Sequence, residues 1–143
     1  MTDEKLTQEQ ADEKQINDAF QELLDRYLES KHRKKVEIIT KAFNFAKQAH
    51  KGVRRRSGEP YILHPIAVAR IACVEIGLGS TSICSALLHD VVEDTDYTVE
   101  DIENLFGPKI AQIVDGLTKY PEAFSATALR LRLKISKAPA YNE

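Results

Sequence analysis

The sequence predicts an all-α protein, a bundle of about six helices in residues 1–120 followed by an irregular C-terminal tail. Apolar side chains recur at spacings of three and four residues over most of the chain. Glycine, proline or a helix-capping residue stands at the breaks between these segments. No strand-like alternation interrupts the pattern before residue 120. With 143 residues, the chain is long enough to form one domain with a substantial core.

The first two helices are predicted from apolar stripes. One covers about residues 5–30 and the other about residues 34–51, where Gly52 can end it. The stripes consist of Ile16, Phe20, Leu23 and Tyr27 in the first helix, and Ile39, Ala42, Phe43, Ala46 and Ala49 in the second. Each helix therefore has one face for the core.

A third helix follows the loop of residues 52–64. Pro65 suits its first position, His64 is placed as the N-cap, and the helix runs to about Ile76. Gly77 then breaks the chain.

The fourth and fifth helices are predicted from their capping residues. Ser80 or Thr81 can cap a helix that ends near Val92. Thr98 and Asp101 resemble a capping box and open a short fifth helix. Gly107-Pro108 separates this helix from a sixth. The side chains expected to face inward are Val99, Ile102, Leu105 and Phe106 in the fifth helix, and Ile110, Ile113, Val114 and Leu117 in the sixth.

Composition and charge exclude several classes of protein. No apolar run is long enough to span a bilayer, and the N-terminus lacks a signal peptide's apolar stretch. Cys73 and Cys84 lie in apolar helical patterns and are expected to be free thiols, which indicates a cytoplasmic protein. Residues 31–56 hold ten Lys or Arg and a single acid, Glu37. This asymmetry indicates either a surface for an anionic partner or solvated helix faces.

A carboxylate falls on the apolar stripe of the fourth helix. Asp90 follows Ile83 by seven residues, so it shares the buried face, and His89 is its neighbour. A buried carboxylate is unfavourable unless it is paired or binds a metal. His64, at the start of the preceding helix, is the best further ligand. The pair is either part of a metal site or a hydrogen-bonded pair in the core.

Two more acids, Glu93 and Asp94, follow about one turn later, where this helix is expected to end. Near a bound metal they would hold or deprotonate its water. Otherwise they belong to an acidic turn ahead of the next helix.

The loop before His64 is strongly basic. Arginines occupy positions 54 to 56, and Gly58 and Pro60 shape a turn that leads to the histidine. Guanidinium groups bind phosphates bidentately and stack on flat rings. Tyr61 adds an aromatic face or packs under the loop. A solvated basic loop is the alternative.

Several of these motifs together resemble a known family. "RRSGEPYILHP" and "LLHDVVEDTD", with "FG" and "IVDGLTK" after them, are similar to the N-terminal hydrolase domain of the RelA/SpoT family. These proteins are the bifunctional (p)ppGpp synthetases and hydrolases of the bacterial stringent response. The resemblance covers about residues 35–120 and implies an HD-type helical fold.

The resemblance implies roles for the acidic and histidine residues. His64, His89 and Asp90 match ligands of a manganese ion, and this mixture of imidazole and carboxylate suits Mn²⁺. Glu93 and Asp94 match the acidic pair that orients or activates the attacking water.

The same resemblance implies a nucleotide site and a reaction. Arg55, Arg56 and Ser57 match the loop that holds the guanine nucleotide. The implied reaction is removal of the 3′-pyrophosphate from (p)ppGpp, which leaves GDP or GTP. We therefore expect a guanine nucleotide as partner, and neither nucleic acid nor a membrane.

The chain departs from the family pattern after about residue 124. In the family a further Asp on a later helix completes the metal site, and no matching motif is found here, so a fourth protein ligand is expected to be missing. We divide the chain into an incomplete HD-type hydrolase domain, residues 1–124, and a divergent tail, residues 125–143. "LRLRLKI", Leu129–Ile135, alternates like a strand with no sheet to join. We expect weak turnover, or a truncated, non-catalytic fragment that keeps the fold and weak nucleotide binding. An unrelated helical interaction module is a third alternative.

Overall fold

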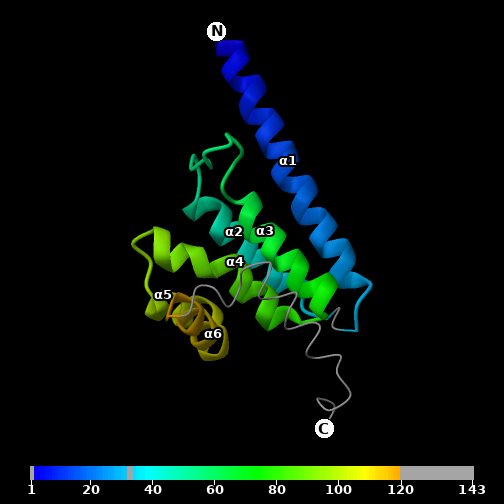
Figure 1. Cartoon of the computed structure of the whole chain (residues 1–143), viewed down its shortest axis with the longest axis vertical. Coiled ribbons are helices and arrows are strands. Elements are labelled where there is room, and N and C mark those ends of the chain that lie inside the picture. Colours follow the sequence, from blue (N-terminus) through cyan, green and yellow to red (C-terminus); the bar gives the residue numbers. More distant parts are fainter. Residues whose placement is uncertain (1, 32–33, 120–143) are drawn as a thin grey trace.

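The computed structural model describes residues 2–31 and 34–119, and every regular element in these ranges is helical (Figure 1). The predicted six-helix, all-α architecture is confirmed. The helices are α1 (Thr2–Leu28), α2 (Val36–Ala49), α3 (Leu63–Arg70), α4 (Ser80–Asp94), α5 (Val99–Phe106) and α6 (Pro108–Lys119), and a π-helical segment, η1 (Ile71–Ile76), continues α3. The only β-type pairing in these ranges is an isolated bridge between Arg54 and Pro60.

Helix α4 lies at the centre of the bundle. It packs against α2, α3 and α6, and α5 is joined to it through α6. Every residue from Ile83 to Val91 is buried. A helix that is covered on all sides must be almost entirely apolar, and the polar exceptions in this stretch are Ser85, His89 and Asp90. The centre of the fold thus contains the residues that the sequence singled out.

Helix α1 runs along one side of the bundle, and its N-terminal part projects beyond the other helices (Figure 1). The predicted stripes of α1 and α2 are confirmed, apart from Ala49, which is only partly buried. Phe20 of α1 stacks on Phe43 of α2 with 3.8 Å between ring centroids. Arg70 pairs with Glu22 and ties the end of α3 to α1.

The start of the third helix differs from the prediction. Helix α3 begins at Leu63 and its N-cap is Ile62, whose backbone is already helical at φ −57° and ψ −23°. His64 therefore lies in the first turn and does not cap the helix. Pro65 is tolerated there because the backbone N–H groups of a first turn have no partner within the helix.

The start of the fourth helix was also misplaced. Gly79 is the N-cap of α4, so Ser80 and Thr81 already belong to the helix. The extended backbone of Gly79, at ψ −169°, allows the turn to start one residue earlier than the hydroxyl side chains suggested. The helix ends at Asp94, two residues beyond the predicted Val92.

Helix α5 begins at the predicted capping box. Asp101 N–H donates to Thr98 Oγ1 at 3.2 Å, and Thr98 N–H donates to Asp101 Oδ2 at 3.0 Å. Ile102 and Phe106 are buried as expected, but the prediction that Leu105 faces inward is wrong, because 40% of it is exposed. Ile102 and Phe106, four residues apart, set the buried face, and Leu105 lies about 100° away from Phe106.

Other predictions from the sequence have mixed outcomes. Cys73 and Cys84 are free and buried, as expected. No helix in the described ranges is long and apolar enough to cross a membrane. The tail of residues 125–143, including its alternating segment, lies outside the described residues.

The contrast between Leu87 and Leu105 gives a test of the fold. Leu87 has no exposed surface, so Leu87→Ala should lower the free energy of unfolding by about 2–5 kcal/mol through a cavity beside the polar pair of α4. Leu105→Ala, in the half-exposed position, should change it by less than about 0.5 kcal/mol. Urea denaturation measures both. Equal losses would contradict the placement of Leu105 on the outer face of α5.

Candidate functional site

His89 and Asp90 form a buried polar pair near the C-terminal end of α4. Only 7% of His89 and 6% of Asp90 is exposed. Their side-chain ends lie together, with 3.1 Å between His89 Nε2 and Asp90 Oδ1. The other ring nitrogen, His89 Nδ1, lies 2.9 Å from the carbonyl oxygen of Ala86. Adjacent residues of a helix thus bring two metal-competent atoms to one point.

The hydrogen bond to Ala86 determines which ring nitrogen of His89 carries a proton. A carbonyl oxygen can only accept, so His89 Nδ1 must carry a proton and donate it. In a neutral imidazole Nε2 then has a lone pair, and this lone pair faces a carboxylate oxygen. Two acceptors at 3.1 Å are held together only by a proton or a cation between them. Their position is therefore suited to a metal ion.

The ionisation of the pair follows from this arrangement. Burial alone would lower the pKa of His89, but the hydrogen bond and charge of Asp90 outweigh it and raise the pKa. Burial alone would raise the pKa of Asp90, but its bonds to His89 and Tyr61 outweigh burial and lower the pKa. Without a metal, the proton between the two side chains is thus strongly held.

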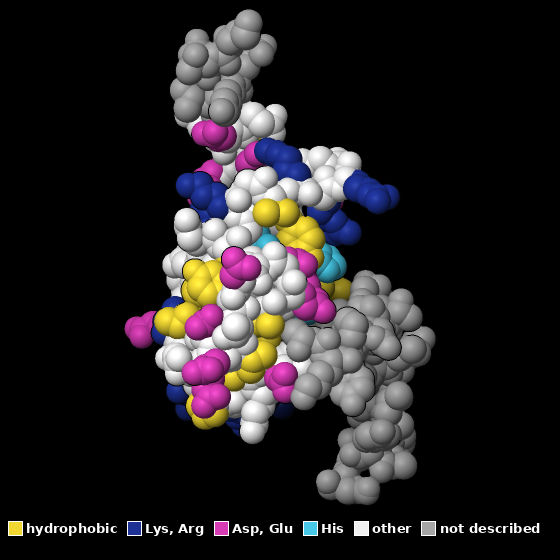
Figure 2. All heavy atoms as spheres, turned by 90° about the vertical axis from the view of Figure 1, so that its left-hand side faces the viewer, with side chains coloured by type: hydrophobic (Ala, Val, Ile, Leu, Met, Phe, Trp, Pro, Cys, Tyr) yellow, Lys and Arg dark blue, Asp and Glu magenta, His cyan; other side chains and the backbone are white. Residues whose placement is uncertain are grey.

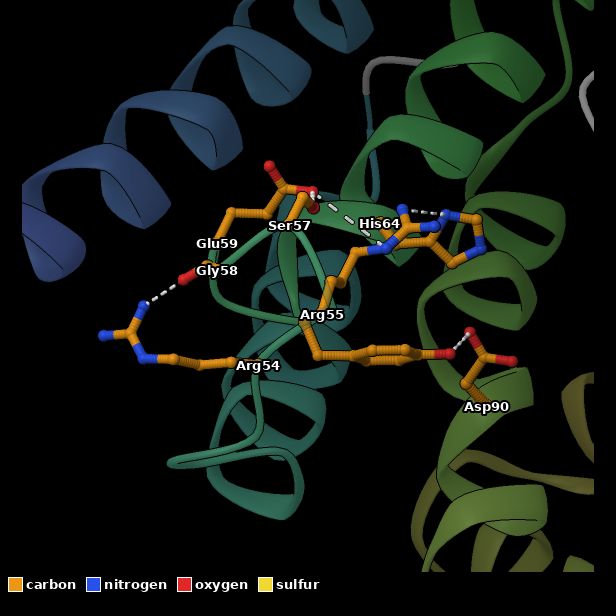
Figure 3. A network of polar contacts seen from close by, with 8 residues as sticks. Arg54, Arg55, Ser57, Gly58, Glu59, His64 and Asp90 are labelled. Carbon is orange, nitrogen blue, oxygen red and sulfur yellow. Dashed lines mark hydrogen bonds and ion pairs between the residues drawn. The ribbon is translucent and has the colours of Figure 1, made fainter.

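Tyr61 is a third member of this cluster. Its hydroxyl donates a hydrogen bond to Asp90 Oδ2 at 3.0 Å, the dashed line to Asp90 in Figure 3. Since Oδ1 lies against His89, both carboxylate oxygens have partners. Burial, followed by the charges of Asp90 and Asp94, raises the pKa of the tyrosine, which keeps the hydroxyl a donor. A partner of this kind orients a ligating carboxylate. From the sequence, Tyr61 was expected to add an aromatic face or to pack under the loop, and its hydrogen bond to Asp90 was not foreseen.

His64 reaches the same region from the first turn of α3. Its Nδ1 lies 3.4 Å from Arg55 Nη1 (Figure 3). Guanidinium groups only donate, so Nδ1 accepts. Burial, opposed by the charge of Asp90 and assisted by Arg55, lowers the pKa of His64 and favours the neutral imidazole. Its one lone pair is then at Nδ1, the nitrogen that faces Arg55, so this is the atom of His64 that a metal would have to share with the loop.

The donor set of the three predicted ligands fits a divalent ion such as Mn²⁺. His64, His89 and Asp90 provide two imidazoles and one carboxylate, and the last two already converge. Among the described residues, however, no group of three or more His, Cys, Asp or Glu side chains stands ready to hold a metal. The three residues therefore fit Mn²⁺ in the kinds of donor atom they offer and in the convergence of His89 with Asp90, but they do not form an assembled three-residue site.

Glu93 and Asp94 lie in the last turn of α4 and are exposed to solvent. Burial and the nearby charge of Asp90 raise the pKa of Glu93. A raised pKa brings a carboxylate closer to the range where it exchanges protons near neutral pH. The predicted pair is thus beside the buried cluster, on its solvent side.

The basic loop is a compact hairpin. Arg55 and Glu59 are joined by a backbone hydrogen bond of 2.9 Å, and the turn between them contains Gly58 at φ +98°. A second backbone bond of 2.9 Å, from Tyr61 to Val53, closes the base of the loop. The positive φ requires glycine at position 58. Arginines and a serine are thereby held at the tip of a defined turn.

The three arginines of this loop are not equivalent. Arg54 and Arg55 project in opposite directions (Figure 3). Arg54 pairs with Asp12 of α1 and donates to the carbonyl oxygen of Gly58, so it anchors the loop to α1. Arg55 points to His64, and Ser57 Oγ donates to Glu59 at 2.8 Å.

A pocket of about 630 Å³ lies between this loop and the end of α4. Figure 2 shows the setting, where histidine, acidic and basic side chains adjoin one another on one face. The residues lining the pocket include Arg55, Arg56, Ser57, Tyr61 and Asp94. The predicted nucleotide residues and one of the predicted water-handling acids therefore share one cavity.

His50 also lines this pocket and was missed from the sequence. It is 3% exposed and its Nε2 has no hydrogen-bond partner among the described residues. A signal was present, since His50 continues the stripe of Ile39, Phe43 and Ala46 on α2. Like Asp90, His50 is a polar residue on an apolar stripe, where a buried polar group needs a partner.

Comparison with known proteins identifies the family of this chain. A family model described as HD domain matches residues 42–137, about two thirds of the chain. The chain belongs to the HD-domain family. Its HD domain matches the hydrolase region of RelA/SpoT-family (p)ppGpp synthase/hydrolases.

The similar proteins are much longer than this chain. A guanosine-3′,5′-bis(diphosphate) 3′-pyrophosphohydrolase of Aquifex aeolicus is 43% identical over 101 residues, which is 71% of this chain and 14% of that protein. The bifunctional (p)ppGpp synthase/hydrolase SpoT of Escherichia coli is 42% identical over 102 residues, with the same coverage. A probable GTP pyrophosphokinase of Mycobacterium leprae is 50% identical over 82 residues, 57% of this chain and 10% of that protein. The chain thus spans between 10% and 14% of these curated relatives.

The buried pair predicts a pH dependence of stability in metal-free protein. The raised pKa of His89 stabilises the fold below about pH 6.5, and this contribution disappears as pH rises through the raised pKa. The lowered pKa of Asp90 stabilises it above about pH 4, and this contribution disappears as pH falls through the lowered pKa. Asp90→Asn should therefore be most destabilising between these limits, by about 1–3 kcal/mol.

Urea denaturation in EDTA at about pH 5, 7 and 9 measures this loss. Asp96→Asn, an exposed carboxylate just past α4, is the control and should show no such window. A loss for Asp90→Asn that is as large at pH 9 as at pH 5 would contradict the proton-bridged pair.

Proposed function

We propose that this domain is a Mn²⁺-dependent 3′-pyrophosphohydrolase of (p)ppGpp, which releases pyrophosphate and leaves GDP or GTP. The observation that carries the proposal is the convergence of His89 Nε2 and Asp90 Oδ1, 3.1 Å apart, near the pocket lined by the basic loop. The names of the relatives from Aquifex aeolicus and Escherichia coli, which describe hydrolases of this kind, support it.

In this proposal His64, His89 and Asp90 hold the cation. When bound, Mn²⁺ would lower the pKa of a water molecule and offset negative charge at the phosphorus under attack. Tyr61 keeps the Asp90 carboxylate oriented through its 3.0 Å hydrogen bond. The carbonyl of Ala86 keeps His89 in the tautomer that leaves Nε2 available.

Glu93 is the proposed general base. It lies one turn beyond His89 on α4, and its pKa is raised by burial and by Asp90. A base with a raised pKa removes a proton from water more effectively than an ordinary carboxylate. Asp94, which lines the pocket, orients the same water or the leaving group.

Arg55, Arg56 and Ser57 are the proposed nucleotide contacts. They stand at the tip of the hairpin and line the pocket, where guanidinium groups can pair with phosphate or stack on the base. Arg54 also lines the pocket but is not proposed for this role, because Asp12 and the Gly58 carbonyl hold its guanidinium on the side of α1. The contact between Arg55 and His64 connects the nucleotide loop to the metal ligands.

Nucleotide binding without turnover is the second candidate. It is favoured by the absence, in residues 2–31 and 34–119, of three His, Cys, Asp or Glu groups that already form a metal site. A site with three protein ligands in this part of the chain is expected to bind Mn²⁺ weakly. Pyrophosphate release separates the two candidates directly.

The function is tested by incubating the chain with ppGpp and Mn²⁺ and measuring pyrophosphate release. We expect slow release that falls by about 10²–10⁴-fold in Glu93→Gln, because the proposed base is removed. Asp96→Asn is the matched control and should retain the wild-type rate. Binding of ppGpp without release would favour the second candidate, and neither binding nor release would overturn both.

Replacing Arg55 or Arg56 by alanine should affect Mn²⁺ affinity differently. Arg55→Ala removes a cation 3.4 Å from His64 Nδ1, so we expect Mn²⁺ to bind about 2–10-fold more tightly. Arg56→Ala should leave Mn²⁺ affinity unchanged. Both should weaken ppGpp binding. Isothermal titration calorimetry measures each affinity, and equal Mn²⁺ affinities in the two variants would show that Arg55 does not act on His64.

A further inference from the structure

His50 ends α2 and is buried in the protein. Its backbone N–H donates to the carbonyl oxygen of Ala46 at 3.0 Å, which completes the last turn of the helix. Its side chain is only 3% exposed, yet Nε2 has no hydrogen-bond partner among the described residues. Buried polar atoms almost always have a partner, because leaving one unpaired is unfavourable. This exception calls for a partner that is not part of the described protein.

The surroundings of His50 show where such a partner would lie. The ring packs against Tyr61 with 4.9 Å between centroids, and Tyr61 is bonded to Asp90. His50 also forms part of the wall of the pocket that Arg55 and Asp94 line. The imidazole thus stands between the carboxylates of α4 and the basic loop.

The carboxylates near His50 also indicate that its partner would lie in this pocket. Burial lowers the pKa of His50, while the charges of Asp90 and Asp94 act on the ring in the opposite direction. These carboxylates belong to the proposed metal and water sites, so the reacting phosphate must lie beside them. A neutral imidazole has one N–H to donate, and a phosphate oxygen is a strong acceptor.

We infer that His50 is a further substrate-binding residue, whose Nε2–H donates a hydrogen bond to an oxygen of the phosphate group under attack. This inference rests on the proposed function. It explains why a polar ring occupies a stripe position on α2, where an apolar side chain would pack equally well. The unpaired Nε2 lowers the stability of the free protein, but it is available to hydrogen-bond the substrate phosphate.

Two variants separate this role from packing. His50→Phe retains a flat ring against Tyr61 but cannot form hydrogen bonds, and His50→Gln retains an amide near the position of Nε2. Both are made in the Glu93→Gln background, in which the nucleotide should bind without being cleaved. Calorimetric titration with ppGpp and with GDP, which lacks the 3′-pyrophosphate, gives the affinities, and thermal denaturation gives the stability.

We expect His50→Phe to be at least as stable as its parent and to bind ppGpp about tenfold more weakly. GDP affinity should change little, and His50→Gln should recover part of the ppGpp affinity. Unchanged ppGpp affinity in a folded His50→Phe protein would overturn the inference and leave the proposed function intact. Equal weakening of ppGpp and GDP would also overturn it.

Other outcomes are equally decisive. A parent protein that binds neither nucleotide would overturn the proposed function, and the inference with it. If His50→Phe does not fold, His50→Gln is compared with His50→Met, which matches it in length but lacks hydrogen-bonding groups. Tighter ppGpp binding by the glutamine variant would support the inference, and equal binding would overturn it.

Discussion

The arrangement of the site depends on two acceptor atoms held together in the core. His89 Nε2 and Asp90 Oδ1 lie 3.1 Å apart on a helix whose neighbouring residues are fully buried, and Ala86 prevents the imidazole from exchanging its proton to the other nitrogen. Such a pair needs a proton or a cation between its members. Tyr61 then satisfies the second carboxylate oxygen. The local geometry thus provides a position for positive charge in an otherwise apolar layer.

Two side chains of the basic hairpin link the buried His89–Asp90 pair to the protein surface. Arg55 and Tyr61 stand at opposite ends of the basic hairpin, and they contact His64 and Asp90 respectively. The hairpin is anchored on its other side by the ion pair between Arg54 and Asp12 of α1. A nucleotide that engages the hairpin would therefore influence the proposed metal ligands His64 and Asp90 directly. The long first helix acts as a brace for the loop as well as a cover for the core.

The sequence predicted the helical architecture because that depends on local periodicity. The stripes of α1 and α2 and the capping box of α5 need no knowledge of distant residues, and apart from Ala49 they were predicted correctly. The errors arose where backbone conformation competed with side-chain preference. Gly79 caps α4 in place of a hydroxyl residue, and Ile62, not His64, is the N-cap of α3. Leu105 was misplaced because a short helix has too few turns to define its buried face.

The site was predictable only in part, for a similar reason. A carboxylate on an apolar stripe is visible in the sequence, and Asp90 is indeed buried. The hydroxyl of Tyr61 and the anchoring of Arg54 were not visible, because their partners are 29 and 42 residues away. The consecutive arginines make different contacts because the hairpin points their side chains in different directions, which the sequence does not reveal. His50 could have been found by the reasoning that found Asp90.

X-ray diffraction from crystals grown with Mn²⁺, measured near the manganese absorption edge, tests most directly whether the His89–Asp90 pair binds a cation. We expect one anomalous peak between His89 Nε2 and Asp90 Oδ1, with His64 as a further ligand. Loss of the peak in Asp90→Asn crystals would confirm the assignment. A peak elsewhere, or none with the His89–Asp90 contact unchanged at saturating Mn²⁺, would contradict the claim that this pair is built for a cation.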